Sequence, residues 1–62
     1  MFFPVNRWNL TGKIVNVAFS HKTAAAAEEH GRKNETTYKD QKFERVFEGT
    51  WLEFDALQKA NK

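Results

Sequence analysis

The sequence predicts a small single α+β domain over residues 1–62, in which a strand and a helix are followed by an antiparallel β-meander. Residues 12–19, GKIVNVAF, are rich in β-branched and apolar side chains, as in a strand. Residues 19–31, FSHKTAAAAEEHG, have the composition and end signals of a helix. Residues 32–54 hold short apolar runs between turn signals, which indicates sheet.

Residues 12–19 are the best candidate for a central strand. Their apolar side chains fall on both faces, with Val15, Val17 and Phe19 on one and Ile14 and Ala18 on the other. Because a strand that is apolar on both faces is buried on both, we expect it to lie in the middle of the sheet.

The helix is expected to begin near Ser20 or Thr23, either of which can cap its first turn, and to end at Gly31. The four alanines at 24–27 form a face of small side chains that allows the helix to lie close to a narrow sheet. Replacing Ala26 by Phe should then overpack the interface and cost about 1–3 kcal/mol. The alternative is that the alanine face admits a partner helix.

The segment after the helix predicts two short strands. Residues 36–38, TTY, form the first, and residues 39–42, KDQK, form a turn. Residues 42–48, KFERVFE, form the second strand, whose alternation places three side chains on one face: Phe43, Arg45 and Phe47.

Residues 49–62 allow two interpretations. Gly49 and Thr50 suit a two-residue hairpin loop that leads into a further strand. Thr50 and Glu53 also have the spacing of a capping box, which indicates a helix. We favour the hairpin, because the apolar side chains of residues 51–57 would spread around most of a helix. A short C-terminal helix capped by Asp55 is then expected over the last residues.

The first eight residues, MFFPVNRW, concentrate aromatic side chains ahead of any clear element. Residues 1–11 are either an arm or an edge strand packed on the sheet, or an anchor for another protein or a second copy of the chain. Aromatic and arginine side chains dominate interface energetics. The residues expected to contact a protein partner are therefore Phe2, Phe3, Arg7 and Trp8.

Charge and aromatic content allow a second kind of partner. The net charge is only +2, but residues 1–27 hold three basic residues and no acidic one. Bases stack on aromatic side chains while cations follow the phosphates. The corresponding candidates for single-stranded nucleic acid are Trp8, Lys13, Lys33, Tyr38, Lys39 and Lys42.

Little in the sequence indicates catalysis or metal binding. The chain has no Cys and one Ser, Ser20, which stands where a helix cap is wanted. His21 and His30 lie nine positions apart, near opposite ends of the expected helix, so they lack the spacing of paired ligands on one helical face. We therefore expect no catalytic, cofactor-binding or metal-ligating residues, and no enzyme.

The sequence thus favours a non-enzymatic interaction module that binds a larger macromolecule, foremost a protein, by occlusion or scaffolding. Small inhibitors encoded by phages and other mobile elements have this size. A small nucleic-acid-binding protein is the alternative. Because no apolar run approaches the ~18 residues of a membrane span, we expect a cytoplasmic protein without a membrane partner.

Overall fold

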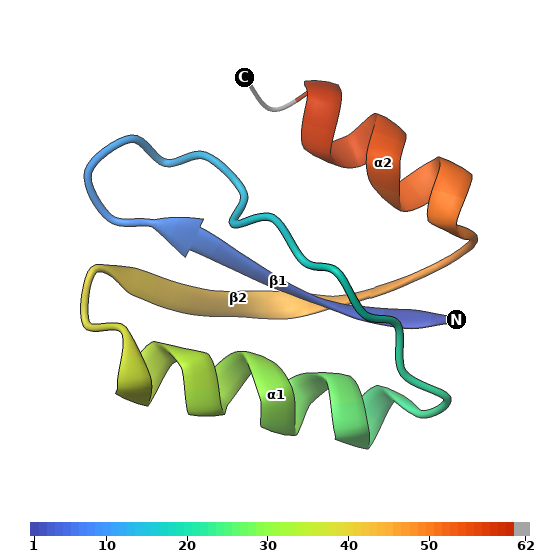
Figure 1. The fold of residues 1–62 in the computed structure, drawn as a ribbon, viewed down its shortest axis with the longest axis horizontal. Helices are drawn as coiled ribbons and strands as arrows, with labels where there is room; N and C mark the ends of the chain where they lie inside the picture. The colour runs from blue at the N-terminus through green and yellow to red at the C-terminus, as the bar shows by residue number, and fades with distance from the viewer. Residues whose placement is uncertain (61–62) are drawn as a thin grey trace.

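The computed structural model describes residues 1–60 and has the order β-α-β-α (Figure 1). Strand β1 spans Phe2–Trp8, helix α1 spans Ala24–Thr37, strand β2 spans Gln41–Glu48 and helix α2 spans Trp51–Ala60. The predicted small α+β class is therefore confirmed, although the order of elements differs from the expected strand, helix and meander.

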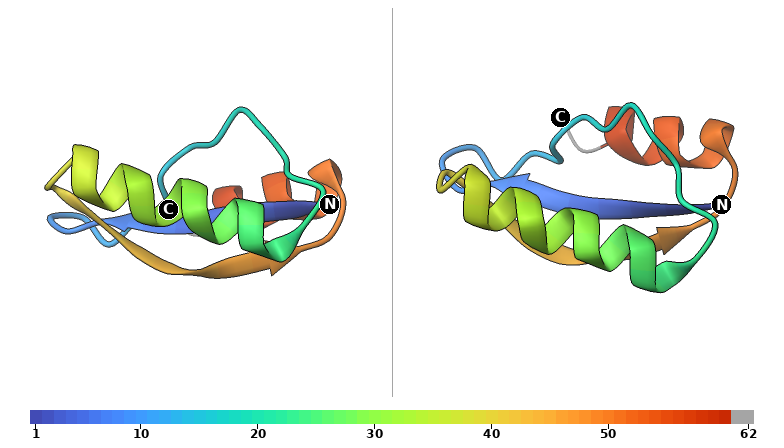
Figure 2. Two further views of the ribbon diagram at one scale, coloured as in Figure 1. Left: turned by 90° about the horizontal axis from the view of Figure 1, so that it is seen from below. Right: turned by 60° about the horizontal axis from the view of Figure 1, so that its bottom comes forward.

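The two strands form an antiparallel sheet with one helix on each face (Figures 1 and 2). The register runs from Phe2 opposite Glu48 to Trp8 opposite Gln41. It shifts between Val5 and Asn6, which leaves Glu44 of β2 as an extra residue. A bulge of this kind moves the following side chains to the other face.

Because of the bulge, the side chains of β2 do not all lie on the faces that were predicted for them. Phe43 lies beneath Gly31 of α1, whereas the ring of Phe47 contacts Phe3 and Phe54 on the α2 side. The expectation that Phe43 and Phe47 share a face is thus wrong, because strict alternation does not cross a bulge. The strand consequently supplies an aromatic side chain to each helix.

Strand β1, rather than residues 12–19, occupies the centre. On one side it pairs with β2, and on the other it makes isolated bridges from Arg7 to Ile14 and from Phe2 to His21. The predicted central strand is therefore an irregular flanking segment, and Phe19 within it is 68% exposed. Residues 2–8 are therefore a strand packed in the domain's own sheet, which is one of the two interpretations offered for the start of the chain.

Helix α1 starts where its cap was expected and continues further than expected. The Thr23 hydroxyl accepts a hydrogen bond from Ala26 N at 3.1 Å, which confirms one of the two proposed caps. The helix passes through Gly31 and ends at Thr37, so the predicted end at Gly31 and the strand at 36–38 are wrong. Gly31 serves close packing instead: a Cβ there would lie 2.8 Å from Phe43 Cε1.

The alanine face is narrower than predicted. Of residues 24–27 only Ala27 is buried, and it lies one turn before buried Gly31. Ala24, Ala25 and Ala26 are exposed, so the predicted cost of a bulky residue at position 26 loses its structural basis. The close approach to the sheet is made at positions 27 and 31.

The segment after β2 is helical, and the favoured hairpin is wrong. Thr50 N donates to Glu53 Oε1 at 2.8 Å, and Glu53 N donates to Thr50 Oγ1 at 3.2 Å. This reciprocal capping box begins α2. The apolar side chains do spread around the helix, but only Phe54 is fully buried and Leu52 is left 80% exposed.

The apolar core lies between β1 and α2. It consists of Phe3, Val5, Ile14 and Phe54, with Val17, Phe47 and Leu57 packed against it. The rings of Phe3 and Phe54 stack with centroids 4.3 Å apart, and Trp51 meets Phe3 edge-on at 4.8 Å. Helix α2 is therefore attached to the sheet mainly through aromatic side chains.

The interface between α1 and the sheet contains a buried polar network. Asn6 Nδ2 donates to Gly31 O at 2.9 Å and to Gln41 Oε1 at 2.7 Å, and both side chains are buried. Asn6 Oδ1 has no partner in the described part of the chain. Because these bonds join β1, β2 and α1, they fix the position of the helix over the strands.

Candidate functional site

The residues predicted to bind a protein partner have different environments in β1. Phe3 is fully buried in the core and is not available to a partner. Phe2, Arg7 and Trp8 are half-buried, and their role in partner contact stays a prediction. The dense aromatic content at the start of the chain therefore reflects, at least at Phe3, the needs of the core.

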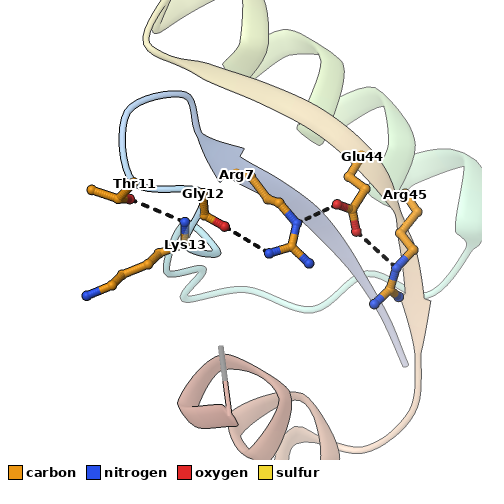
Figure 3. Close-up of polar contacts among 6 residues, drawn as sticks. All are labelled: Arg7, Thr11, Gly12, Lys13, Glu44 and Arg45. Carbon is orange, nitrogen blue, oxygen red and sulfur yellow. Dashed lines mark hydrogen bonds and ion pairs between the residues drawn. The ribbon is translucent and has the colours of Figure 1, made fainter. Parts of the chain in front are cut away.

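Arg7 belongs to a polar cluster on the α2 side of the sheet (Figure 3). Its Nε donates to Glu44 Oε1 and its Nη1 to Gly12 O at 2.9 Å, while Arg45 Nε lies 3.3 Å from the other carboxylate oxygen of Glu44. The hydrogen bond from Arg7 lowers the pKa of Glu44, and the charges of Arg7 and Arg45 lower it further. Arg7 thus joins β1, β2 and the 9–12 turn, and its guanidinium is already engaged.

Two turns at one end of the molecule bring most of the nucleic-acid candidates together (Figure 1). Asn9 joins the turns: its backbone N–H donates to Asp40 O at 2.8 Å and its side chain to Lys39 O at 3.3 Å. The residues gathered at this end are Trp8, Lys13, Tyr38, Lys39 and Lys42. The sixth candidate, Lys33, lies on α1, where it lines a pocket with His21 and His30.

This basic end is also apolar at its tip. Leu10 is 96% exposed in the first turn, and Tyr38 is exposed in the second. Asp40 is the acidic residue of the second turn. The end therefore offers cations, an aromatic ring and an aliphatic side chain to a partner.

A second exposed apolar group lies at the start of α2. Leu52 is 80% exposed and Trp51 is 39% exposed, although the Trp51 ring also contacts Phe3. Met1 lies at the same end of the molecule, since its carbonyl accepts a hydrogen bond from Gly49 N at 2.9 Å, and its side chain is exposed. We call Met1, Trp51 and Leu52 the α2 apolar group. The expectation of a hairpin strand after Gly49 and Thr50 does not predict this group.

His21 and His30 meet, although their spacing gave no reason to expect it. His21 lies outside the helix, in the segment that flanks β1, and its Nε2 is 2.9 Å from Nδ1 of His30 in α1. The pKa of His30 is lowered, mainly by burial and further by the charges of His21 and Lys33. The premise that the two imidazoles lie far apart is therefore wrong.

The remaining surface of α1 is a solvated helix face. An open groove runs along it, lined by Ala25, Glu28, Glu29, Arg32, Lys33 and Thr36. Glu28 and Arg32 form an ion pair of 2.7 Å across one turn of this groove. Such exposed pairs contribute little free energy, so the groove is typical of an exposed helix.

The described residues offer few groups for catalysis or metal binding. Among residues 1–60, no three or more His, Cys, Asp or Glu side chains are placed to hold a metal ion together. None of the helices in this part of the chain is long and apolar enough to cross a membrane.

That the protein has no enzymatic activity stays a prediction from the sequence. Comparison with protein-family models, curated proteins and solved structures finds no match to this chain.

Proposed function

We propose that this protein is a non-enzymatic interaction module that binds a larger protein through the α2 apolar group and acts by occlusion or scaffolding. The observation that supports it is that Leu52 is 80% exposed at the end of the molecule where Trp51 and Met1 are also exposed, in a chain with few apolar side chains to spare. Apolar clusters on a small surface mark interaction sites more often than isolated exposed side chains do. A cytoplasmic location belongs to the same proposal.

The charged residues near the α2 apolar group indicate which kind of partner surface would complement it. Three acidic residues lie within four positions of Leu52 in the chain: Glu48 at the end of β2, and Glu53 and Asp55 in the first turns of α2. Lys59, which pairs with Asp55 at 3.1 Å, lies one turn further along. The complementary surface is therefore an apolar groove with a basic rim.

The test compares two exposed leucines at different places in the fold. Immobilised wild-type protein, Leu52→Gln and Leu10→Gln are incubated with nuclease-treated lysate of the source organism, and the affinity of each for any captured protein is then measured by calorimetry. Burying a leucine side chain contributes about 1.5–3 kcal/mol, so Leu52→Gln should weaken binding about tenfold or more. Both variants should keep the wild-type melting temperature.

Two outcomes would contradict the proposed surface. One is equal binding by Leu52→Gln and wild type, and the other is capture that occurs from a parallel, untreated lysate but not from the nuclease-treated one. Sedimentation of the purified protein completes the experiment, because a concentration-dependent dimer that Leu52→Gln abolishes would identify the partner as a second copy.

Nucleic-acid binding is a second candidate, supported by the gathering of three lysines and two aromatic side chains at the basic end. A labelled single-stranded oligonucleotide titrated at two salt concentrations tests it. Each phosphate contact should contribute about 0.7 to the slope of log affinity against log salt. Lys39→Ala should reduce that slope, whereas Lys59→Ala on α2 should not. Binding that is weak and independent of salt would exclude this candidate.

A further inference from the structure

The imidazoles of His21 and His30 come from two parts of the fold that are each held in place. His21 is fixed by paired backbone hydrogen bonds with Phe2, of 2.8 and 2.9 Å. His30 lies in the body of α1, one residue before Gly31, which packs against the sheet. The backbone at both residues is therefore held in place independently of the contact between the two rings.

The two nitrogen atoms face each other at a spacing close to that of two ligands on one ion. They are 2.9 Å apart, and the rings are inclined at 76°. Two imidazole nitrogens bound to one tetrahedral zinc ion at about 2.0–2.1 Å are about 3.3 Å apart. To hold one ion, the nitrogens would separate by a few tenths of an ångström and both rings would turn so that their lone pairs converge beside the line that joins the two atoms.

The surroundings leave room for an ion with water ligands. The rings line an open pocket of about 450 Å³ together with Ala26, Glu29 and Lys33. Glu29 and Lys33 bring one acidic and one basic side chain to the lining of this pocket. Since no third His, Cys, Asp or Glu ligand is placed with them among residues 1–60, water would complete the coordination.

We propose that His21 and His30 form a two-histidine site for a divalent transition-metal ion of the Ni²⁺, Cu²⁺ and Zn²⁺ class, which joins the segment flanking β1 to α1. Imidazole is the ligand that these ions share, whereas Mg²⁺ and Ca²⁺ require oxygen ligands. The site is independent of the proposed protein-binding function, because it involves neither α2 nor the basic end.

The experiment measures thermal unfolding of the untagged chain by circular dichroism at pH 7.5 with added Ni²⁺, and with Mg²⁺ as the control. The sequence holds two His, so no other imidazole competes. At a hundredfold excess over its dissociation constant, Ni²⁺ should raise the melting temperature by about 10 °C or more. His21→Gln and His30→Gln should each lose this shift, measured against the metal-free form of the same variant, and Mg²⁺ should cause none.

The proposal is overturned if Ni²⁺, Cu²⁺ and Zn²⁺ leave the wild-type melting temperature unchanged, or if either variant keeps the full shift. A second measurement covers the case in which a variant fails to fold. Paramagnetic Cu²⁺ added to the wild-type protein should broaden the imidazole proton signals of His21 and His30 before any others in its NMR spectrum. Broadening that spares these signals would equally overturn it.

Discussion

Replacing Gly31 by Ala should destabilise the protein, although Ala is the better helix former. A Cβ at this position would lie 2.8 Å from Phe43 Cε1, closer still to Cδ1 of the same ring, and 2.9 Å from Asn6 Oδ1. If Phe43 turned away, its ring would lose the contact with the guanidinium of Arg32, which lies over it at 5.0 Å, while its backbone stays paired in β2. The substitution therefore forces α1 away from the sheet or distorts the Asn6 network.

The magnitude follows from two opposing contributions. Exchanging Gly for Ala inside a helix stabilises by about 1 kcal/mol, and overpacking a tight interface costs about 1–3 kcal/mol. With atoms this close we take the upper part of the second range, which leaves a net loss of about 1–2 kcal/mol. For a domain of this size the melting temperature should fall by about 4–16 °C.

The assay is reversible thermal and urea unfolding followed by circular dichroism. Ala25→Gly, at an exposed position of the same helix, calibrates the intrinsic Gly-to-Ala difference without packing. In a Phe43→Leu background the cost of Gly31→Ala should shrink, because the ring that it meets is gone. A higher melting temperature for Gly31→Ala than for wild type would refute the close packing of α1.

Three further predictions concern stability. Ala27→Phe should lower the free energy of unfolding in urea by about 1–3 kcal/mol, because Ala27 is fully buried. Ala25→Phe should change the same free energy by less than about 0.5 kcal/mol. Equal effects of the two substitutions would contradict the packing of α1. Asn6→Asp should lower the free energy of unfolding by more than about 2 kcal/mol, because it places a carboxyl group against two carbonyl oxygens in a buried site. An unchanged midpoint of urea unfolding would contradict the buried network. Because Arg7 lowers the pKa of Glu44, the ionised carboxylate stabilises the fold above the ordinary value of 4.5, and this contribution is lost as pH falls through the lower folded-state pKa. Glu44→Gln should therefore flatten the acid side of the stability profile, and an unaltered profile would show that the ion pair does not contribute.

The parts of the fold that the sequence predicted correctly depend on local signals. The Thr23 cap and the run of good helix formers after it predict α1, and the alternation of residues 42–48 predicts β2. The capping-box spacing of Thr50 and Glu53 is also a local signal. In the structure these two residues form the box, and the segment is a helix rather than a strand. The spread of apolar side chains around a helix favours a strand over the same residues, and this indication is wrong.

The parts that the sequence could not predict depend on contacts between distant residues. Residues 2–8 and 12–19 are both apolar, and nothing local shows which one takes the centre of the sheet. The bulge at Glu44 places Phe43 and Phe47 on opposite faces of the sheet. In sequence, Gly31 looks like the end of a helix, whereas in the structure it allows α1 to pack closely on the sheet. The meeting of His21 and His30 likewise arises only because the flanking segment returns along β1.

These contacts decide where function can be probed. A deletion of residues 1–5 removes Phe3 and Val5, the centre of the core, so loss of binding after that deletion would report unfolding and not the loss of an interface. Leu52, Leu10 and the two imidazoles are better probes, because changing them removes little buried apolar surface. A chain that buries only about 60% of its unfolded surface has little stability to lose. Tests of partner and metal binding therefore need variants whose melting temperature is measured alongside the binding.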